Sequence, residues 1–488
     1  MSALKVAVKW SGKKYDVDVD LSQPGIVFKT QLYTLTGVAP ERQKIMVKGG
    51  TLKDDADMSK LGLKEGQQLM MMGTAGELPK APEKQVVFME DMSDAQIAQT
   101  LKLPSGLVNM GNTCYMNATM QCFRAVPELH NALVKMPTTI SNDNRGNLVV
   151  SMRTLFDELD KSGSAVPPLV FLQVLRGVFP QFGEMNNHGY MQQDAEECWS
   201  QIVHVLGEKV PGLEVGGELN KDKHFVEQYM SGEFLTTMTC DEAPDEQPVT
   251  GIETFNKLRV NIGSGVSTYM MNDIAKGLIE PIEKNSPTLG RSAMYTKKAK
   301  ITRLPAYLAI NFVRFQWRPD INKKTKILKK VQFPHELDAS ELCTIELQEK
   351  LRPAKLRLKE VAEAKDAERK AKKAKLEDGG SSSEEVADAP VAGPNEIEKM
   401  KEIGVDPSLY NDVGANVSGQ YELVAVLTHV GRAADSGHYI GWVKQRGIWW
   451  KFDDDKVSQV APDEIEKLSG GGDWHSAYIA LYKAKRIE

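Results

Sequence analysis

Apolar and charged residues alternate along the beginning of the chain. Every second residue from Leu4 to Trp10 is apolar, and residues 15–21 repeat the alternation with aspartates on the other side. Ser11-Gly12, between the two runs, is typical of a tight turn. The pattern predicts a β-hairpin with one buried face and one charged face.

A helix and two further strands are expected next. Pro24-Gly25 opens the helix and Gly37 ends it. Its apolar residues are Val27, Leu32 and Leu35. Strands expected at residues 44–47 and 67–72 complete a ββαββ order, which resembles a ubiquitin-like β-grasp module. No Gly-Gly pair follows residue 72, so we expect a permanent docking domain and not a conjugated tag.

Composition divides the chain into segments. Residues 1–75 form the expected docking domain, and residues 76–102 are a Pro-containing, weakly periodic linker. A second domain is expected at residues 103–488, interrupted at about residues 350–403. The interruption is rich in Lys, Glu and Ala and then in Gly and Ser, which predicts an exposed helix leading into a disordered insertion.

Charge and cysteine content exclude several classes of protein. A net charge of −5 gives no indication of nucleic-acid or membrane binding. The five cysteines form no CxxC pair, which argues against a disulfide framework and a closed zinc site. We find no signal peptide and no apolar run near the ~20 residues of a membrane span, and expect a soluble intracellular protein.

Residues 106–123 contain the candidate nucleophile, Cys114. It follows Asn112 and Thr113, either of which could cap a helix that begins at the cysteine. A thiol in the first turn of a helix feels the positive end of the helix dipole, which favours the thiolate. Asn109 could direct its amide at the oxyanion that forms when a thiolate attacks a carbonyl. The alternative is an ordinary buried cysteine.

A histidine and an acid near the C-terminus could serve such a nucleophile. His438 follows a glycine and begins an expected strand, a setting that His429 and His475 lack. A strand returning antiparallel would bring Asp453 beside His438 to fix its tautomer, with Asp454 as the rival carboxylate. A solvated acidic turn is the alternative.

A third polar segment lies at residues 190–199. Asp194 and Glu197 are three residues apart on an expected helix, so they should share a face. A helix with a capped, acidic first turn would have the same sequence.

Four segments together resemble the ubiquitin-specific protease family of cysteine deubiquitinases. They read, in order, GLVNMGNTCYMNATMQC, YMQQDAEECW, SGHYIGWV and WWKFDDDKV. The resemblance covers roughly residues 103–485 and implies an α+β protein, in which a papain-like thumb, palm and fingers follow the β-grasp domain. It implies hydrolysis of the bond after ubiquitin's last glycine through an acyl-enzyme on Cys114, with His438 as base, Asp453 as its orienter and Asn109 as oxyanion donor.

The resemblance also suggests how ubiquitin would bind. Gln193, Asp194, Glu197 and Tyr439 match positions that contact the ubiquitin tail, and the two acids would face its arginines. Many family members carry CxxC pairs for zinc in the fingers, but here the nearest candidate is the single Cys240. We therefore expect no metal, no cofactor, and fingers held by packing alone.

Two segments match loops that block the tail groove in a proteasome-associated family member. They are residues 314–325 and 431–436, and their candidate gating residues are Phe315, Trp317, Gly431, Arg432 and Ser436. Ordinary surface loops are the alternative. The resemblance implies self-inhibition that is relieved on the proteasome.

The expected partners are ubiquitin conjugates and the regulatory particle of the 26S proteasome, which the ubiquitin-like domain would bind. The expected location is the proteasome in cytoplasm and nucleus, without membrane or nucleic-acid contacts. Two other functions stay open: a non-catalytic scaffold for ubiquitin and the proteasome, and a protease for another ubiquitin-like tag.

Overall fold

The chain forms two compact units, Met1–Met92 and Ser93–Glu488. The computed structural model describes residues 3–75, 103–137, 140, 142–263, 267–319, 322–375, 394–432, 436–472 and 474–487. The expected linker at residues 76–102 lies outside these ranges, as does the middle of the expected insertion, residues 376–393.

The first unit is a β-grasp fold. Its described elements are β1 (Ala3–Trp10), β2 (Lys13–Asp20), α1 (Gly25–Thr36), β3 (Lys44–Val47), β4 (Gly50–Thr51) and β5 (Gln67–Met72). The sheet order is β2-β1-β5-β3-β4, with β1 parallel to β5 and the other pairs antiparallel. The predicted hairpin, helix and later strands are therefore all present.

The helix α1 is rotated relative to the expected apolar face. Phe28 and Leu32 are buried against the sheet, whereas Val27 and Leu35 are 37% and 50% exposed. Phe28 and Leu32 are four residues apart, so they lie on one face of the helix, the face that packs on the sheet. Val27 and Leu35 lie outside this face. The expectation for those two residues was wrong, while the predicted end was right: Gly37 is left-handed, with φ of 69°.

A layer of helices forms one part of the second unit. It contains α3 (Cys114–Phe123), α4 (Pro127–Lys135), α5 (Asn144–Lys161), α6 (Leu169–Val178), α7 (Ala195–Lys209) and α8 (Phe225–Tyr229). Every residue of α3 is buried, because this helix packs between α7 and the strand that begins at His438. Gly441 permits the close approach, since a Cβ there would lie 3.2 Å from the Ala118 carbonyl oxygen.

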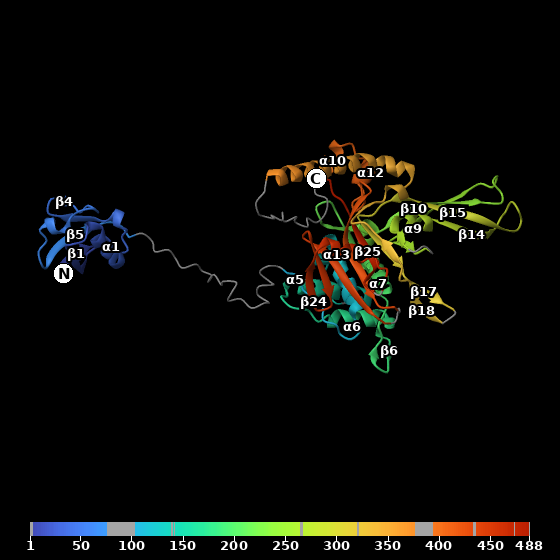
Figure 1. Ribbon diagram of the computed structural model, residues 1–488, viewed down its shortest axis with the longest axis horizontal. Coiled ribbons are helices and arrows are strands. Elements are labelled where there is room, and N and C mark those ends of the chain that lie inside the picture. The colour runs from blue at the N-terminus through green and yellow to red at the C-terminus, as the bar shows by residue number, and fades with distance from the viewer. Residues whose placement is uncertain are drawn as a thin grey trace. The chain divides into compact units, whose positions relative to one another are not determined.

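The large sheet lies beside these helices (Figure 1). Its order is β12 (Leu258–Asn261), β16 (Tyr307–Val313), β25 (Ser476–Ala484), β21 (Gln420–Val430), β22 (His438–Gln445), β23 (Ile448–Asp453) and β24 (Lys456–Val460), and β20 (Glu336–Asp338) also pairs with β21. One hydrophobic cluster lies on each side of the sheet, because residues of β21 and β25 alternate between the two clusters.

A second sheet extends from the body on the right of Figure 1. Its order is β11 (Val249–Phe255), β10 (Gly232–Cys240), β15 (Ser292–Arg303) and β14 (Ile279–Asn285). Cys240 lies near its tip in a small apolar cluster with Tyr295. Glu246 accepts hydrogen bonds from the Tyr295 hydroxyl and Ser286 Oγ, each at 2.6 Å. The expectation that packing alone would hold these strands is therefore wrong.

Several short strands and helices connect the larger elements of the second unit. They are β6 (Met185–Asn186), β7 (Gly189–Tyr190), β8 (Pro211–Leu213), β9 (Leu219–His224), β13 (Ser267–Tyr269), α9 (Met270–Gly277), β17 (Phe315–Arg318), β18 (Lys323–Lys326), β19 (Lys330–Gln332), α12 (Pro407–Tyr410) and α13 (Pro462–Glu466). No helix among the described residues combines the length and apolar character that crossing a membrane requires.

The expected insertion begins and ends in helices. They are α10 (Ile345–Lys375) and α11 (Pro394–Glu402). Leu351 and Ala354 of α10 and Met400 of α11 are buried in the second core cluster. The expected helix is therefore present, but its first turns and the second helix belong to the core.

Candidate active site

Cys114 is the first residue of α3 and is 3% exposed. The loop before it turns sharply, with left-handed φ values of 94° at Gly111 and 53° at Asn112. Thr113 occupies the N-cap position but makes no side-chain cap, because its hydroxyl accepts a hydrogen bond from the Met110 amide at 2.9 Å. The expected side-chain cap is therefore absent, and the threonine instead tightens the loop that presents the thiol.

His438 begins β22 and lies between an acid and the thiol. Its Nε2 is 2.7 Å from Oδ1 of Asp453, the last residue of β23. A hydrogen bond with Cys114 is the largest cause that raises the pKa of His438 to about 9; burial opposes the rise and Asp453 adds to it. The antiparallel strands β22 and β23, joined through Arg446-Gly447, thus bring His438 and Asp453 together, while α3 supplies Cys114.

Asp453 is itself held by two cationic donors. Its Oδ1 faces His438, and its Oδ2 lies 3.0 Å from Nζ of Lys451. Burial acts to raise the pKa of Asp453, but the hydrogen bonds from His438 and Lys451 outweigh burial and hold this pKa below its ordinary value. Asp453 is therefore ionised near neutral pH.

The rival carboxylate, Asp454, faces two asparagines. Its Oδ2 accepts a hydrogen bond from Asn109 Nδ2 at 2.8 Å, and its Oδ1 accepts one from Asn117 Nδ2 at 2.9 Å. Its Oδ2 is 4.0 Å from His438 Nε2, well beyond the distance of Asp453. The backbone of Asp454 is left-handed, with φ of 55°, so the side chains of Asp453 and Asp454 point in different directions.

Asn109 is fixed at both ends of its amide. Oδ1 accepts hydrogen bonds from the Gly111 amide at 2.9 Å and the Thr113 amide at 3.3 Å, while Nδ2 donates to Asp454. Because Nδ2 carries two hydrogens, one donor is left after this bond. Asn109 therefore has a set orientation within the loop that precedes Cys114.

The competing histidines are held neutral in the interior. Burial, with a contribution from Lys326, lowers the pKa of His429 to about 3. Burial also lowers the pKa of His475 to about 4, and Nδ1 of His475 lies 3.4 Å from the Thr428 hydroxyl. Neither histidine is protonated at neutral pH, which separates both from His438.

The expected tail-binding residues lie at and beside the start of α7. Asp194 is the N-cap of α7 and therefore immediately precedes the helix, while Glu197 lies three residues further on, in the first turn. Oδ1 of Asp194 accepts hydrogen bonds from the Glu196 amide at 2.9 Å and the Tyr478 hydroxyl at 2.7 Å. Glu197 lies in the first helical turn and accepts a hydrogen bond from Gln181. The alternative of a capped, acidic first turn describes this segment correctly.

Tyr439 and the side-chain nitrogen of Gln193 are buried, whereas residues that bind ubiquitin directly must be accessible. Tyr439 is 0% exposed and packs beside Tyr478 and His429. The side-chain nitrogen of Gln193 is buried and has no hydrogen-bond acceptor among the described residues. A contact between Tyr439 and ubiquitin would require the surrounding aromatic side chains to separate.

The first expected gating loop contains a hairpin. The strands β17 and β18 pair from Phe315↔Lys326 to Arg318↔Lys323, where the sequence indicated only a loop. Phe315 is buried, with its ring centroid 5.3 Å from those of His429 and Tyr478, whereas Trp317 is 58% exposed.

The hairpin is fastened to the second expected gating loop. Nζ of Lys326 donates to the carbonyl of His429 at 2.6 Å, and the Lys326 amide donates to the carbonyl of Arg432 at 3.2 Å. The second loop begins at Gly431, with φ of 118°, and Ser436 O lies 3.2 Å from His429 Nε2. Residues 433–435 lie outside the described chain. The two expected gating segments are therefore neighbours.

Sequence reasoning missed three side chains that position this site. They are Asn117, which bonds Asp454; Lys326, which joins the two gating segments; and Tyr478, which bonds Asp194. Asn117 carried one usable signal, since an asparagine among the apolar residues of a buried helix requires a polar partner. The other two depend on contacts between distant segments.

Comparisons with known proteins assign both units. Residues 105–482 match the family described as ubiquitin carboxyl-terminal hydrolase, and residues 4–76 match the ubiquitin family. The chain is 44% identical to ubiquitin carboxyl-terminal hydrolase 7 of Arabidopsis thaliana over 499 residues, covering 99% of each chain. It is 44% identical to ubiquitin carboxyl-terminal hydrolase 6 of Schizosaccharomyces pombe, again over 99% of each chain.

A more distant relative and a solved structure agree with these matches. Ubiquitin carboxyl-terminal hydrolase 14 of Caenorhabditis elegans is 36% identical, over 99% of this chain and 94% of that protein. The fold is similar to that of the SAGA Ubp8/Sgf11/Sus1/Sgf73 DUB module bound to ubiquitin aldehyde, with a TM-score of 0.51 and 18% identity, covering 83% of this chain and 73% of that one.

Proposed function

This chain belongs to the ubiquitin carboxyl-terminal hydrolase family, and from that premise we propose that Cys114 is the nucleophile of a cysteine deubiquitinase. The observation that carries the assignment is the position of His438, whose Nε2 lies 2.7 Å from Oδ1 of Asp453 and whose pKa is raised above all by the neighbouring Cys114. Since Nε2 faces Asp453, Nδ1 is the nitrogen left for the thiol.

The reaction follows from these positions. The Cys114 thiolate attacks the carbonyl carbon of ubiquitin's last glycine, and an oxyanion forms that the Asn109 amide stabilises. The His438 imidazolium protonates the leaving lysine amine as the C–N bond breaks, which leaves a thioester on Cys114. Neutral His438 then takes a proton from the water that attacks the thioester. Asp453 holds the ring in place throughout.

The pH dependence of hydrolysis tests the protonation of His438. A free histidine loses its proton near pH 6.5. Because the pKa of His438 is raised to about 9, the leaving-group proton is present at neutral pH and is lost as the pH rises through about 9. The kcat/KM for a fluorogenic ubiquitin substrate should therefore fall above about pH 9. An alkaline limb near pH 6.5 would contradict the assignment.

We propose that ubiquitin's arginine-containing tail enters beside the start of α7. The first turn of α7 carries Glu196 and Glu197, and Asp194 caps it; Glu196 is paired with Lys257, so the acidic charge left at this helix start comes from Asp194 and Glu197. Tyr439 and Gln193 lie within this region, and the buried side-chain nitrogen of Gln193 has no acceptor within the described part of the chain. A Glu197→Gln variant should raise KM for the fluorogenic substrate with little change in kcat; an unchanged KM would remove Glu197 from the tail site.

We propose that the β17–β18 hairpin and residues 431–436 hold the free enzyme in a self-inhibited state. The buried ring of Phe315, the bond of Lys326 Nζ to the His429 carbonyl and the bond of the Lys326 amide to the Arg432 carbonyl support this, because together they fasten the hairpin beside the aromatic cluster that contains Tyr439. Docking on the proteasome would release these contacts.

Removing the Phe315 ring should activate the isolated enzyme. Aromatic contacts contribute ~0.5–1.5 kcal/mol beyond area burial, so Phe315→Ala should increase kcat/KM of the chain alone by about three- to tenfold. Trp317→Ala, on the same hairpin but with an exposed ring, is the matched control and should have little effect. Self-inhibition is ruled out if the unmodified free enzyme hydrolyses conjugates as fast as the proteasome-bound enzyme.

We propose that the ubiquitin-like unit docks on the proteasome regulatory particle through exposed methionines. Met46 of β3 and Met70 of β5 are paired in register and are 43% and 55% exposed. Flexible, polarisable methionines adapt to apolar partner surfaces. A Met46→Ser/Met70→Ser variant should bind purified 26S proteasome at least about tenfold more weakly, whereas Val27→Ser, on α1, should bind normally. Equal binding by both variants would exclude this face.

Proteasome binding would place the enzyme in the cytoplasm and nucleus. The domain boundaries that we propose are 1–75 for docking, 76–102 for the linker and 103–488 for catalysis. Fluorescence microscopy of the tagged chain tests the location: the Met46→Ser/Met70→Ser variant should lose its overlap with proteasomes.

A further inference from the structure

The hairpin formed by β6 and β7 contacts the loop that precedes Cys114. Its strands pair Met185 with Tyr190 and Asn186 with Gly189, and Figure 1 shows β6 projecting from the rest of the second unit. Met185 and Tyr190 are 63% and 37% exposed, and neither belongs to a hydrophobic core cluster. Specific contacts, and not burial in the core, must therefore hold this hairpin in place.

The first of these contacts joins the hairpin to the loop. Nδ2 of Asn112 donates a hydrogen bond to the carbonyl of Tyr190 at 2.8 Å. Asn112 lies two residues before Cys114 and has a left-handed backbone, with φ of 53°. Such a backbone is uncommon outside glycine and persists where the surroundings hold it. The bond to Tyr190 is one contact that holds the loop in this conformation.

The second contact joins the hairpin to α6. The guanidinium carbon of Arg176 lies 3.4 Å from the centroid of the Tyr190 ring. A guanidinium over an aromatic face is attracted by the negative charge of that face. Nε of Arg176 donates a hydrogen bond to the carbonyl of Phe182 at 3.1 Å, which orients the guanidinium. The stacked pair therefore fixes the position of Tyr190, and with it the carbonyl that Asn112 binds.

The loop conformation decides where Asn109 points. Oδ1 of Asn109 accepts hydrogen bonds from the amides of Gly111 and Thr113, on either side of Asn112. A change of backbone at Asn112 would move both donors and release the Asn109 amide. Because a displacement of about 1 Å near a reacting atom can cost roughly 10²-fold in rate, a loosened Asn109 would stabilise the oxyanion poorly.

We propose that Tyr190 and Arg176 are positioning residues for the oxyanion donor Asn109. Arg176 holds Tyr190, the Tyr190 carbonyl holds Asn112, and Asn112 holds the loop that orients Asn109. Both residues act through Asn112 and not on the reacting atoms. The inference rests on the proposed hydrolysis at Cys114 and adds α6 and the β6–β7 hairpin to the parts of the chain that support it.

Removal of the Tyr190 ring tests the proposal. Tyr190→Ala should lower kcat by about three- to thirtyfold, the value of a cation–π contact, with little change in KM because no charge is altered. The measurement is hydrolysis of the fluorogenic ubiquitin substrate by the full chain, with purified proteasome depleted of its own deubiquitinases. Tyr190→Phe keeps the ring and should retain kcat, as should Met185→Ala on the paired strand. An unchanged kcat in Tyr190→Ala, or an equal loss in Tyr190→Phe, would overturn the proposal.

Asn112→Gly tests the next contact in the series. Glycine accepts the left-handed backbone, so this change removes the amide donor without a steric penalty. It should lower kcat by about three- to tenfold, the value of one hydrogen bond. The double variant Asn112→Gly/Tyr190→Ala should lose little more than the worse of the two single variants, because both act through the same bond. Losses that multiply would show that the two residues act separately and would contradict the proposed series.

Ubiquitin aldehyde reports on the oxyanion site directly. The Cys114 sulfur adds to the aldehyde carbon, and the thiol proton passes to the oxygen of the resulting thiohemiacetal, which lies where the oxyanion forms. Tyr190→Ala should raise the Ki for ubiquitin aldehyde by about the same factor by which it lowers kcat. Its Kd for unmodified ubiquitin, measured by calorimetry, should not change. Equal weakening of both ligands would indicate a damaged ubiquitin site and would overturn the proposal.

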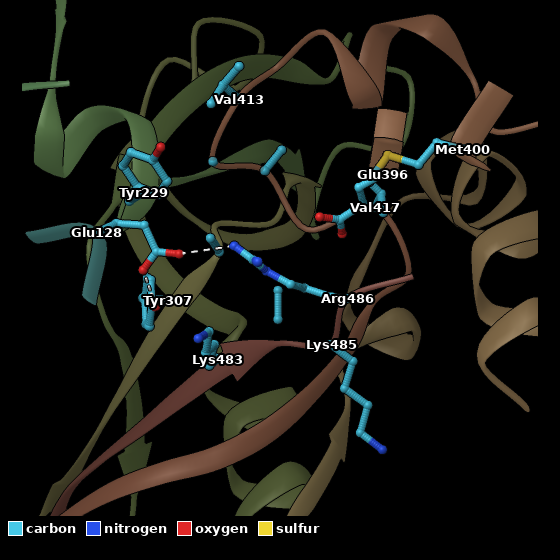
Figure 2. Close-up of a pocket in the computed structure, with 14 residues that line it drawn as sticks. Glu128, Tyr229, Tyr307, Glu396, Met400, Val413, Val417, Lys483, Lys485 and Arg486 are labelled. Atoms are coloured by element: carbon cyan, nitrogen blue, oxygen red, sulfur yellow. Dashed lines mark hydrogen bonds and ion pairs between the residues drawn. The ribbon is translucent and has the colours of Figure 1, made fainter. Parts of the chain in front are cut away.

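A stability control separates positioning from general loosening. Figure 2 shows Arg486 beside Glu128, at a pocket whose lining contains none of the residues assigned to catalysis. Nη2 of Arg486 lies 3.4 Å from Oε1 of Glu128, and Arg486→Met removes this partly buried ion pair, so the melting temperature should fall. Its kcat and its Ki for ubiquitin aldehyde should stay unchanged. If Arg486→Met reproduces the effects of Tyr190→Ala, those effects are general loosening and the proposal is wrong.

Failure of this inference is distinguishable from failure of the proposed reaction. If Cys114→Ala retains hydrolysis, the proposed nucleophile is wrong. If Cys114→Ala is inactive while Tyr190→Ala and Asn112→Gly keep the kcat and the aldehyde Ki of the unmodified chain, the reaction stands and the positioning role of Tyr190 and Arg176 is wrong.

Discussion

Replacing Cys114 with alanine will reduce fluorophore release from the ubiquitin C-terminus by about 10⁴-fold or more. If His438 is the acid–base partner of Cys114, the thioester intermediate can form only on the Cys114 sulfur. Without that sulfur, a water molecule is not placed to attack the carbonyl carbon in its stead. The measurement is steady-state hydrolysis with and without purified proteasome depleted of its own deubiquitinases. The unmodified chain should be faster with proteasome.

The control for this variant is another buried cysteine of the same helix. Burial raises the pKa of Cys122, so it is no nucleophile, and Cys122→Ser should keep most of the activity. Ubiquitin binding, measured by calorimetry, should survive Cys114→Ala. Substantial residual hydrolysis would show that Cys114 is not the nucleophile, and a native chain that binds ubiquitin without hydrolysing it would favour the scaffold function.

The second large effect separates two adjacent carboxylates. Asp453→Asn should lower kcat by about 10²–10⁴-fold, because an amide cannot hold the imidazolium or fix its tautomer as a carboxylate does. It should also move the alkaline limb of the pH profile to lower pH, since the bond to Asp453 contributes to the raised pKa of His438.

Asp454→Asn is the matched comparison. This change disturbs the bonds to Asn109 and Asn117, so oxyanion stabilisation should fall, with a loss of about 10–10³-fold in kcat. The alkaline limb should move much less than in Asp453→Asn. If Asp454→Asn instead shifts the limb and Asp453→Asn does not, the roles of the two aspartates are the reverse of those proposed.

The sequence predicts the β-grasp unit well because its signals are local. Alternation of apolar and charged residues in β1 and β2 and the left-handed glycine after α1 each depend on a few neighbouring residues. The apolar face of α1 was misassigned because Val27 and Phe28 are adjacent and both apolar. One residue of a helix corresponds to about 100°, so the choice between them depends on the sheet below.

The sequence identifies which residues form the candidate site, but it does not predict how their side chains are arranged. Cys114, His438 and Asp453 lie in recognisable segments, but three consecutive aspartates do not reveal that Asp454 has a left-handed backbone. Its bond to Asn117 joins residues that are 337 positions apart. Such contacts follow from the packing of α3 on β22 and not from local sequence.

The gating segments show the same limit. Residues 314–325 are expected to be a loop because they match a blocking loop of a family member, and their polar residues and Pro319 give little indication of a strand. The hairpin is held by Phe315 against distant aromatic rings and by Lys326 on the carbonyl of His429. A buried lysine that bonds a carbonyl has no signature in the sequence.

The most direct test of thioester chemistry on Cys114 is reaction with ubiquitin that carries a C-terminal propargylamide. The intact mass should increase by one ubiquitin probe, and peptide mapping should place the modification on Cys114. Cys122→Ser should react as the unmodified chain does, and Cys114→Ala should not react. A probe adduct on Cys122 or Cys198, or an undiminished adduct in Cys114→Ala, would contradict the account.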